Sequence, residues 1–128
     1  AFCDRYKVLN NLKQTNVKIV DARSESRFLG VTPEPREGVR SGHIPGAINL
    51  HYSQLLSNGC FLPVEQLKAL FINMAKQDDV MIMTCGSGIT ACILLLAAHL
   101  CGFDKASVYD GSWSEWGAIH ELPITTSK

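Results

Sequence analysis

The 128-residue sequence has no net charge and no hydrophobic run long enough to cross a membrane. Its 12 basic and 12 acidic residues balance, so it offers no general attraction for nucleic acid or for an anionic membrane surface. The longest apolar stretch, residues 89–100, is interrupted by His99 and is shorter than a bilayer requires. We therefore expect neither a nucleic-acid partner nor a membrane partner, and any preference for anions must come from a local site.

The cysteines show none of the spacings that hold zinc. None of the five stands in a C-x-x-C pair or at a zinc-like distance from histidine, so we expect no metal site. An odd and scattered set of cysteines is typical of a reducing compartment, and we expect a cytoplasmic protein. Cys92 and Cys101 fall within an apolar segment, and we expect both to be small core residues.

Length and pattern indicate a single domain, residues 1–128, in which strands and helices alternate. A chain of 128 residues with 46% hydrophobic content can build one core. Apolar runs predict strands, while periodic apolar positions and the capping residues Asp4, Ser112 and Gly102 predict helices. The expected strands are 17–21, 47–50, 80–84 and 106–109, and the expected helices are 5–14, 24–28, 64–75, 91–100 and 112–120.

This alternation predicts an α/β fold in which a mostly parallel sheet is covered by helices on both faces. Ligands of such sheets bind outside the carboxyl ends of the strands. Three segments stand at such ends and are expected to converge: Ala22-Arg23, Cys85 and Asp110-Gly111. The segment 30–46 carries three prolines and four glycines, so it is too broken for a helix and is expected to be irregular.

A short loop connects the apolar strand 80–84 to the apolar helix that follows it, with the sequence Cys85-Gly86-Ser87-Gly88-Ile89-Thr90. A cysteine at a helix N-terminus meets unpaired backbone N–H groups and the positive end of the helix dipole, which stabilise a thiolate. The two glycines allow a tight curl that exposes N–H groups, and the two hydroxyl residues add donors. The loop therefore predicts a nucleophile for sulfur or phosphorus chemistry.

Three other interpretations of this loop fit less well. A cysteine phosphatase needs an arginine six residues after its nucleophile to bind the phosphoryl oxygens, and here that residue is Ala91. Residues 86–91 match the G-x-G-x-x-A string of dinucleotide-binding folds, with Asp110 about 20 residues later, yet that unit opens a Rossmann sheet and here it stands near the end. A buried structural cysteine is the remaining alternative.

Four segments in a fixed order are more specific than the loop alone. They are IVDAR at 19–23, SGHIPGAIN at 41–49, CGSGITAC at 85–92 and YDGSWSEW at 109–116. Together they resemble the rhodanese family, and within it the 3-mercaptopyruvate sulfurtransferases. The resemblance implies a rhodanese-like, mostly parallel five-stranded sheet with helices on both faces. In two-domain relatives these segments lie in the C-terminal catalytic domain, so the resemblance also implies an N-terminal rhodanese-like domain as a partner.

The resemblance implies a sulfurtransferase that needs no organic cofactor. Cys85 would attack the sulfur of a donor such as 3-mercaptopyruvate and keep it as a persulfide, with Ser87 as a second catalytic residue. The substrate and the outer sulfur would be bound by the rest of the loop, which is Gly86, Gly88, Ile89 and Thr90. The acceptor would be a thiol, cyanide or a thioredoxin-like protein. Thiosulfate as the donor, or a sulfur-carrier or binding module without turnover, are the alternatives.

Two arginines stand in an R-F…P-E-P-R pattern that resembles the substrate-binding arginines of the same relatives. Arg27 and Arg36 would hold the carboxylate of the donor, because a guanidinium can bind it bidentately. The alternative is that they pair with Glu25, Glu34 or Glu37 on a solvated face. Since the loop itself carries no cation, we expect mercaptopyruvate to be preferred to thiosulfate, which is a compact dianion.

Several further residues near these segments are expected to be structural, and they are His43, Arg40, Asp21, Arg23, Trp113 and Trp116. The histidine would fix its turn through a ring-to-backbone hydrogen bond. The aspartate and Arg23 would pair with neighbouring loops. The tryptophans, three apart on one helical face, would be core residues or anchors at a domain interface.

Overall fold

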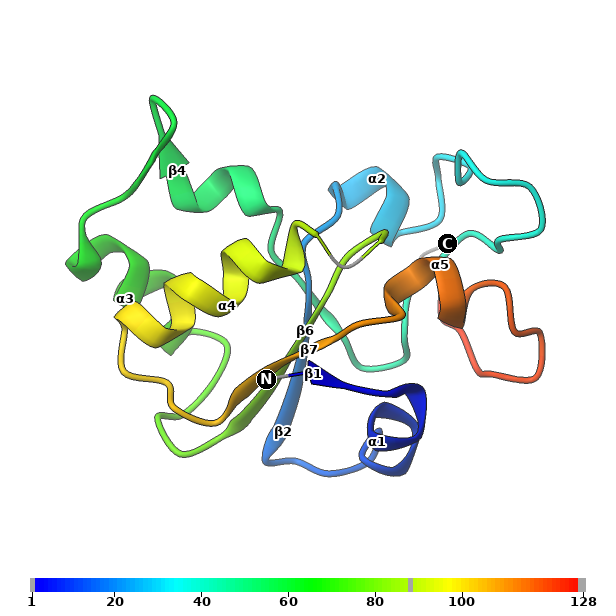
Figure 1. The fold of residues 1–128 in the computed structure, drawn as a ribbon, viewed down its shortest axis with the longest axis horizontal. Helices are drawn as coiled ribbons and strands as arrows, with labels where there is room; N and C mark the ends of the chain where they lie inside the picture. Colours follow the sequence, from blue (N-terminus) through cyan, green and yellow to red (C-terminus); the bar gives the residue numbers. More distant parts are fainter. Residues whose placement is uncertain (1, 88, 127–128) are drawn as a thin grey trace.

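The computed structural model describes residues 2–87 and 89–126 and centres on a parallel five-stranded sheet (Figure 1). Every neighbouring pair in this sheet is parallel, as the strand–helix alternation predicted. The strands follow the order β1 (Phe2–Cys3), β7 (Ala106–Tyr109), β6 (Val80–Thr84), β2 (Val17–Asp21) and β3 (Ile48–Asn49). The three central strands have the bounds expected from the sequence, and the short edge strand β1 was not expected.

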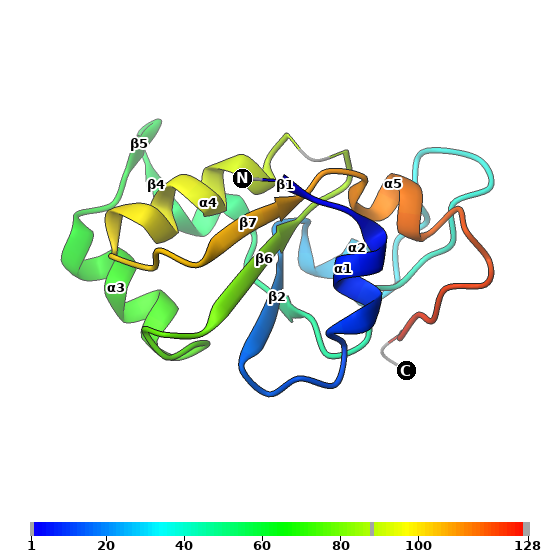
Figure 2. The same ribbon diagram turned by 60° about the horizontal axis from the view of Figure 1, so that its bottom comes forward.

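Helices cover both faces of the sheet (Figure 2). One face packs against α3 (Val64–Ile72) and α4 (Ala91–Leu100), and the other against α1 (Arg5–Asn10) and α5 (Ser112–Trp116). Shorter elements complete the chain, namely α2 (Glu25–Phe28), the 3-10 helix η1 (Tyr52–Leu55) and an antiparallel hairpin of β4 (Leu56–Ser57) and β5 (Cys60–Phe61). No helix of the described residues is long and apolar enough to cross a membrane.

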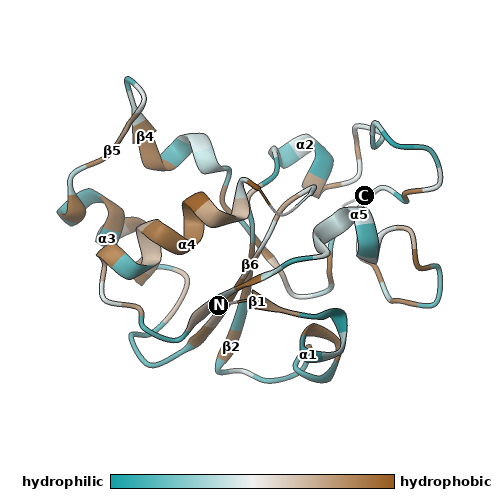
Figure 3. Ribbon diagram, in the orientation of Figure 1, coloured by the Kyte–Doolittle hydropathy of each residue, from teal (hydrophilic) through white to brown (hydrophobic). Residues whose placement is uncertain are grey.

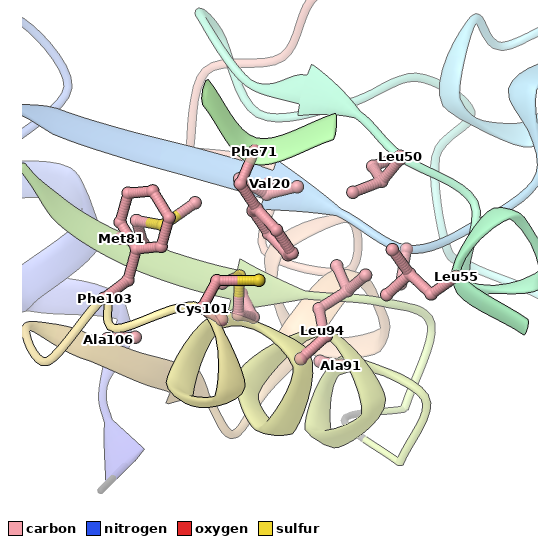
Figure 4. Packing of buried hydrophobic residues seen from close by; sticks show 14 of the residues in the cluster. Val20, Leu50, Leu55, Phe71, Met81, Ala91, Leu94, Cys101, Phe103 and Ala106 are labelled. Atoms are coloured by element: carbon pink, nitrogen blue, oxygen red, sulfur yellow. The ribbon is translucent and has the colours of Figure 1, made fainter. Parts of the chain in front are cut away.

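Side chains of the central strands alternate between two hydrophobic clusters. Met81 and Met83 of β6 pack under α3 and α4, whereas Ile82 packs under α1 and α5, because successive residues of a strand point to opposite faces. In the first cluster, Leu94 of α4 and Phe71 of α3 project toward the strands (Figure 4). Helix α4 is hydrophobic over much of its length, whereas α2 is mainly hydrophilic (Figure 3). The sheet is therefore held from both sides, which fixes the ends of its strands.

Helix α4 corrects one expectation about the cysteines. Cys101 is 4% exposed and belongs to the core as expected, but Cys92 is exposed. The buried positions of α4 recur at Ala91, Leu94 and Ala97–Ala98, one turn apart, so the residue next to Ala91 falls outside this stripe. The helix ends at Leu100 as expected, but Cys101 is its cap residue, and the expected cap Gly102 follows with a φ of +87° and donates its N–H to the carbonyl of His99.

Three helices end earlier than the sequence predicted. Helix α1 begins at the expected cap, where the Asp4 carboxylate accepts from the Lys7 N–H, but it ends at Asn10 because the Asn11 side chain binds the Lys7 carbonyl at 2.7 Å. Helix α3 ends at Ile72, short of the expected residue 75. Helix α5 ends at Trp116, and the carbonyls that follow are bound by the guanidinium of Arg40. A local side-chain contact thus ends α1, whereas a contact with a distant segment marks the end of α5.

Candidate active site at Cys85

Cys85 directly follows β6, at the carboxyl end of the sheet, and is 1% exposed. Its backbone is held by the turn that leads into α5. Its N–H donates to the Ser112 hydroxyl at 3.1 Å, and its carbonyl accepts from the Trp113 N–H at 2.8 Å. The Gly86 carbonyl accepts from the Ser114 N–H at 2.9 Å. The β7–α5 turn therefore fixes the first two residues of the cysteine loop.

Ser112 was expected to cap α5, and this prediction is wrong. Gly111 occupies the cap position, while Ser112 lies inside the helix boundary with a φ of +51°, in the left-handed region that side chains rarely adopt. Its buried hydroxyl donates to the Tyr109 carbonyl at 2.9 Å and accepts from the Cys85 N–H. The strained backbone thus aims one hydroxyl at the residue that we expect to be the nucleophile.

Two cavities adjoin the cysteine loop and share Arg27, Gly86 and Ser87 in their walls. The first, of about 230 Å³, is also lined by Glu34, Arg36 and Ser114. The second, of about 360 Å³, is also lined by Ala22, Arg23, His51, Tyr52 and Thr90. The segments after β2 and β6 therefore converge as expected. At the end of β7, the residues that reach the cysteine loop are not Asp110-Gly111 but those that follow them in α5.

The structure brings most of the expected site residues to these cavities. Arg27, Gly86 and Ser87 line both, Arg36 lines the first and Thr90 the second. Ile89 is 76% exposed and lines neither cavity. Gly88 lies outside the described residues. The functional roles assigned to all of these residues stay predictions.

Arg27 faces the cysteine loop and is held by Glu34. Its Nε and Nη2 donate to the two carboxylate oxygens of Glu34 at 3.2 and 2.7 Å. Its guanidinium lies against the loop backbone, since a Cβ placed on Gly86 would be 3.0 Å from Nη2. The hydrogen bonds that Arg27 donates to Glu34 raise the pKa of Arg27 against the opposing effect of burial, and electrostatic interactions with Glu34, Asp21 and Cys85 raise it further. Arg27 therefore carries a permanent positive charge at the site.

The same carboxylate joins Arg27 to a second, fully buried arginine. Glu34 also accepts from Arg23 Nη1 at 3.3 Å, and Arg23 pairs with Asp21 at 2.8 Å. Arg23 further binds the Gly42 carbonyl and stacks over the Trp113 ring. Arg23 pairs with a neighbouring loop as expected, through Glu34 and Gly42, whereas Asp21 pairs with Arg23 itself. Arg27 does pair with a glutamate, but at the cavity wall rather than on a solvated face.

The remaining structural expectations are largely confirmed. His43 places Nδ1 at 2.7 Å from the Phe28 carbonyl and stacks on the Phe28 ring. Arg40 binds backbone carbonyls after α5, including those of Gly117 and Ile119. The tryptophans Trp113 and Trp116 are core residues, at 1% and 0% exposure. An interface role for the tryptophans is wrong, because their rings are covered within this domain.

Sequence reasoning missed the functional connections that depend on distant partners. The contact of Ser112 with Cys85 spans 27 positions, and nothing near either residue indicates it. The sequence predicts Glu34 only as a partner on a solvated face, although its position between Arg27 and Arg36 in the chain is a signal for a role at the site. His51 and Tyr52 line the second cavity and were not considered. Within residues 2–87 and 89–126, no cluster of three or more His, Cys, Asp or Glu side chains could hold a metal ion.

Comparison with known proteins relates this arrangement to a family. Residues 4–119 match the Rhodanese-like domain. The chain is 45% identical over 113 residues to the 3-mercaptopyruvate sulfurtransferase of Mus musculus, covering 85% of this chain and 37% of the relative. It is 42% identical over 125 residues to the thiosulfate sulfurtransferase of Bos taurus, covering 94% of this chain and 41% of the relative. The chain thus spans about two fifths of the length of these curated relatives.

A solved structure agrees with the sequence comparison. The Tum1 protein from Saccharomyces cerevisiae superposes with a TM-score of 0.86 at 28% identity, covering 98% of this chain and 46% of that one. Its agreement with the parallel five-stranded sheet confirms the expected fold. The family match covers nearly the whole described chain and includes the cysteine loop. The chain therefore belongs to the family of proteins with a rhodanese-like domain.

Proposed function

We propose that this chain is the catalytic domain of a sulfurtransferase, which takes sulfur from 3-mercaptopyruvate and carries it as a persulfide on Cys85. The observation that carries the proposal is that Cys85 directly follows β6, and that the next residues, Gly86 and Ser87, line a cavity to which Arg27 brings a fixed positive charge. The printed names of the relatives, which include a 3-mercaptopyruvate and a thiosulfate sulfurtransferase, support sulfur transfer.

In the proposed reaction the Cys85 thiolate attacks the sulfur atom of mercaptopyruvate. A sulfur–sulfur bond forms, the carbon–sulfur bond of the donor breaks, and its electron pair leaves on carbon as the enolate of pyruvate. A proton from the transferred S–H or from solvent then converts the enolate to pyruvate. An acceptor thiol, cyanide or a thioredoxin-like protein removes the outer sulfur in a second step, which implies ping-pong kinetics.

The residues of the first cavity have the chemistry that this donor requires. Arg27 and Arg36 line the same space of about 230 Å³ and would bind the substrate carboxylate. Ser87 lies where the two cavities meet, so its hydroxyl would donate to the 2-oxo oxygen as negative charge develops there. Thr90 and the loop backbone would hold the anionic outer sulfur. In this assignment Cys85 and Ser87 are catalytic and the arginines bind substrate.

Thiosulfate is the second candidate donor, and a particular contact favours considering it. The loop has no basic side chain at Gly86 or Ser87, but the Arg27 guanidinium lies against Gly86 and places a cation beside the loop. The name of the bovine relative points to the same donor. We still propose mercaptopyruvate as the preferred donor, because it presents one carboxylate to the two arginines instead of a compact dianion to the loop.

The proposal extends to a second domain and to the cellular compartment. Because the relatives are more than twice as long as the matched region, we propose that an N-terminal rhodanese-like domain packs against this one and adds groups that act with Ser87. A reducing, cytoplasmic compartment would agree with the odd number and scattered positions of the five cysteines in the sequence. One relative is named as mitochondrial, so a location test should include that organelle.

The decisive test is mass spectrometry of the protein after brief treatment with mercaptopyruvate. We expect one added sulfur atom, located on the peptide that contains Cys85, and release of one pyruvate for each persulfide. Cys85→Ser should abolish both, whereas Cys92→Ser, at an exposed position of α4, should leave both unchanged. Sulfur found on Cys60 or Cys101 instead of Cys85 would refute the proposal.

A further inference from the structure

We infer that Glu34 is a positioning residue, which holds the Arg27 guanidinium in the orientation that binds a substrate carboxylate. The inference rests on the proposed function in one respect, the role of Arg27 as the carboxylate ligand. Glu34 was expected only as a partner on a solvated face, and its positioning role explains why an acidic side chain lines a cavity proposed to bind an anion.

The geometry of the pair determines which edge of Arg27 faces a ligand. Glu34 occupies the Nε and Nη2 edge of the guanidinium through two hydrogen bonds. A guanidinium is planar, so the Nη1 and Nη2 edge is the one left to bind another carboxylate bidentately. Both nitrogens of this second edge lie near Gly86, since a Cβ placed there would be 3.0 Å from Nη2 and 3.7 Å from Nη1, and Arg27 and Gly86 together line both cavities. Glu34 thus fixes the orientation of the Arg27 guanidinium, which would otherwise rotate.

Burial makes this arrangement rigid. The Glu34 side chain is 3% exposed and Arg23 is 1% exposed, whereas Arg27 is 30% exposed. Glu34 is itself anchored by Arg23, which is bound to Asp21 and Gly42 and stacked on Trp113. The contacts therefore connect Asp21, at the end of β2, through buried side chains to the partly exposed guanidinium of Arg27. Substrate can reach only this exposed part of Arg27.

The charges in this group balance one another. Asp21, Arg23, Glu34 and Arg27 alternate in sign and sum to zero, so the two arginines do not repel each other across an empty gap. Without the Glu34 charge, two guanidinium groups would share a buried space with a single carboxylate. Arg27 would then move away from Arg23 and lose its fixed direction.

The test compares Glu34→Gln with Glu37→Gln, a matched control in the same segment. Glu37 is exposed, so neutralising it removes the same charge without touching the Arg27 pair. Equilibrium binding of pyruvate to the full-length protein, measured by calorimetry, reports on carboxylate binding without requiring turnover. We expect Glu34→Gln to weaken pyruvate about tenfold, as loss of a charge-assisted hydrogen bond implies. We expect Glu37→Gln to bind as the unaltered protein does.

The Arg27→Ala background shows whether Glu34 acts through Arg27. In the Arg27→Ala protein, Glu34→Gln should cause no further loss of pyruvate affinity, because the guanidinium that Glu34 orients is absent. Three results would each overturn the inference. The first is that Glu34→Gln lowers pyruvate affinity equally with and without Arg27. The second is that Glu34→Gln leaves pyruvate affinity unchanged when Arg27 is present, and the third is that the unaltered protein binds no pyruvate. If mercaptopyruvate fails to form a persulfide while pyruvate binding follows this pattern, the proposed function fails and the role of Glu34 stands.

A further substitution keeps the inference testable if Glu34→Gln does not fold. Arg27→Lys retains the positive charge but cannot form the two-point contact with Glu34. We expect it to weaken pyruvate binding nearly as much as Arg27→Ala does. Affinity equal to that of the unaltered protein would show that charge alone suffices and that no positioning by Glu34 is needed.

Discussion

The cysteine loop is held from two sides by different kinds of contact. On the α5 side, Ser112, Trp113 and Ser114 bind the backbone of Cys85 and Gly86 through uncharged hydrogen bonds. On the α2 side, Arg27 meets the same loop with a full charge and is itself paired with Glu34. Uncharged bonds to the backbone fix a position and add no net charge, whereas the charged side can attract a ligand. We therefore expect changes on the α5 side to affect turnover and changes on the α2 side to affect substrate binding.

Removing Arg27 should have the largest effect on substrate binding. We expect Arg27→Ala to raise KM for mercaptopyruvate by about tenfold to a hundredfold, because a charge-assisted bidentate contact is lost. The change in kcat should be smaller, since the arginine holds substrate equally before and during the reaction. Arg36→Ala should raise KM less, because Arg36 is exposed and more strongly solvated. Steady-state kinetics decide this, and a fall in kcat at constant KM would contradict the division between the two sides.

Removing the Ser112 hydroxyl should test the α5 side. We expect Ser112→Ala to lower kcat several-fold with little change in KM, because the Cys85 N–H loses its acceptor and the loop is held less firmly. Ser112→Gly removes the same hydroxyl but tolerates the positive φ, so it should be more stable than Ser112→Ala by about 1 kcal/mol. Chemical denaturation measures this difference. Equal stability of the two variants would show that the backbone is not strained at Ser112. A raised KM in Ser112→Ala would contradict the expectation that the α5 side affects turnover and not substrate binding.

The smallest effect is expected where the two sides meet. Gly86→Ala adds a methyl group about 3 Å from Arg27 Nη2. Because Arg27 is a side chain that can shift, we expect only a twofold to threefold rise in KM for mercaptopyruvate, with kcat preserved. The same variant should retain the persulfide on Cys85 in the mass spectrum. A loss of persulfide would mean that the methyl group disturbs the α5 side instead.

Much of the fold could be predicted because its signals are local. The strands β2, β6 and β7 have continuous apolar runs, and Asp4 and Gly102 mark helix ends by their own conformational preferences. The position of the cysteine at a strand end follows from the same pattern. Arg27 and Arg36 were identified through resemblance to relatives, and no periodicity would have found them.

The rest depends on partners that are distant in the chain. Helix α5 ends early because Arg40 binds the carbonyls beyond it, at a separation of 77 positions for Gly117. Ser112 looks like a helix cap from its neighbours, but Cys85 provides its partner. Cys92 looks apolar by its surroundings, yet its place around the helix axis puts it outside the buried stripe. In each of these cases the prediction failed on the face that a residue occupies or on the residue that it contacts. Local sequence composition does not determine either.

The hydrogen bonds between Arg40 and the end of α5 have a consequence for local unfolding of the domain. Its guanidinium binds the carbonyls of Trp116, Gly117, Ile119 and Leu122 at 2.7 to 3.0 Å, and its own carbonyl accepts from the Trp113 indole N–H. The C-terminal segment is thereby joined to the segment before β3, so the two should exchange their amide hydrogens together as one cooperative unit. Because Trp113 and Ser114 clamp the loop, each such opening would also release Cys85. The amide hydrogen of Cys85, which is donated to the Ser112 hydroxyl, would then exchange at the rate of that opening.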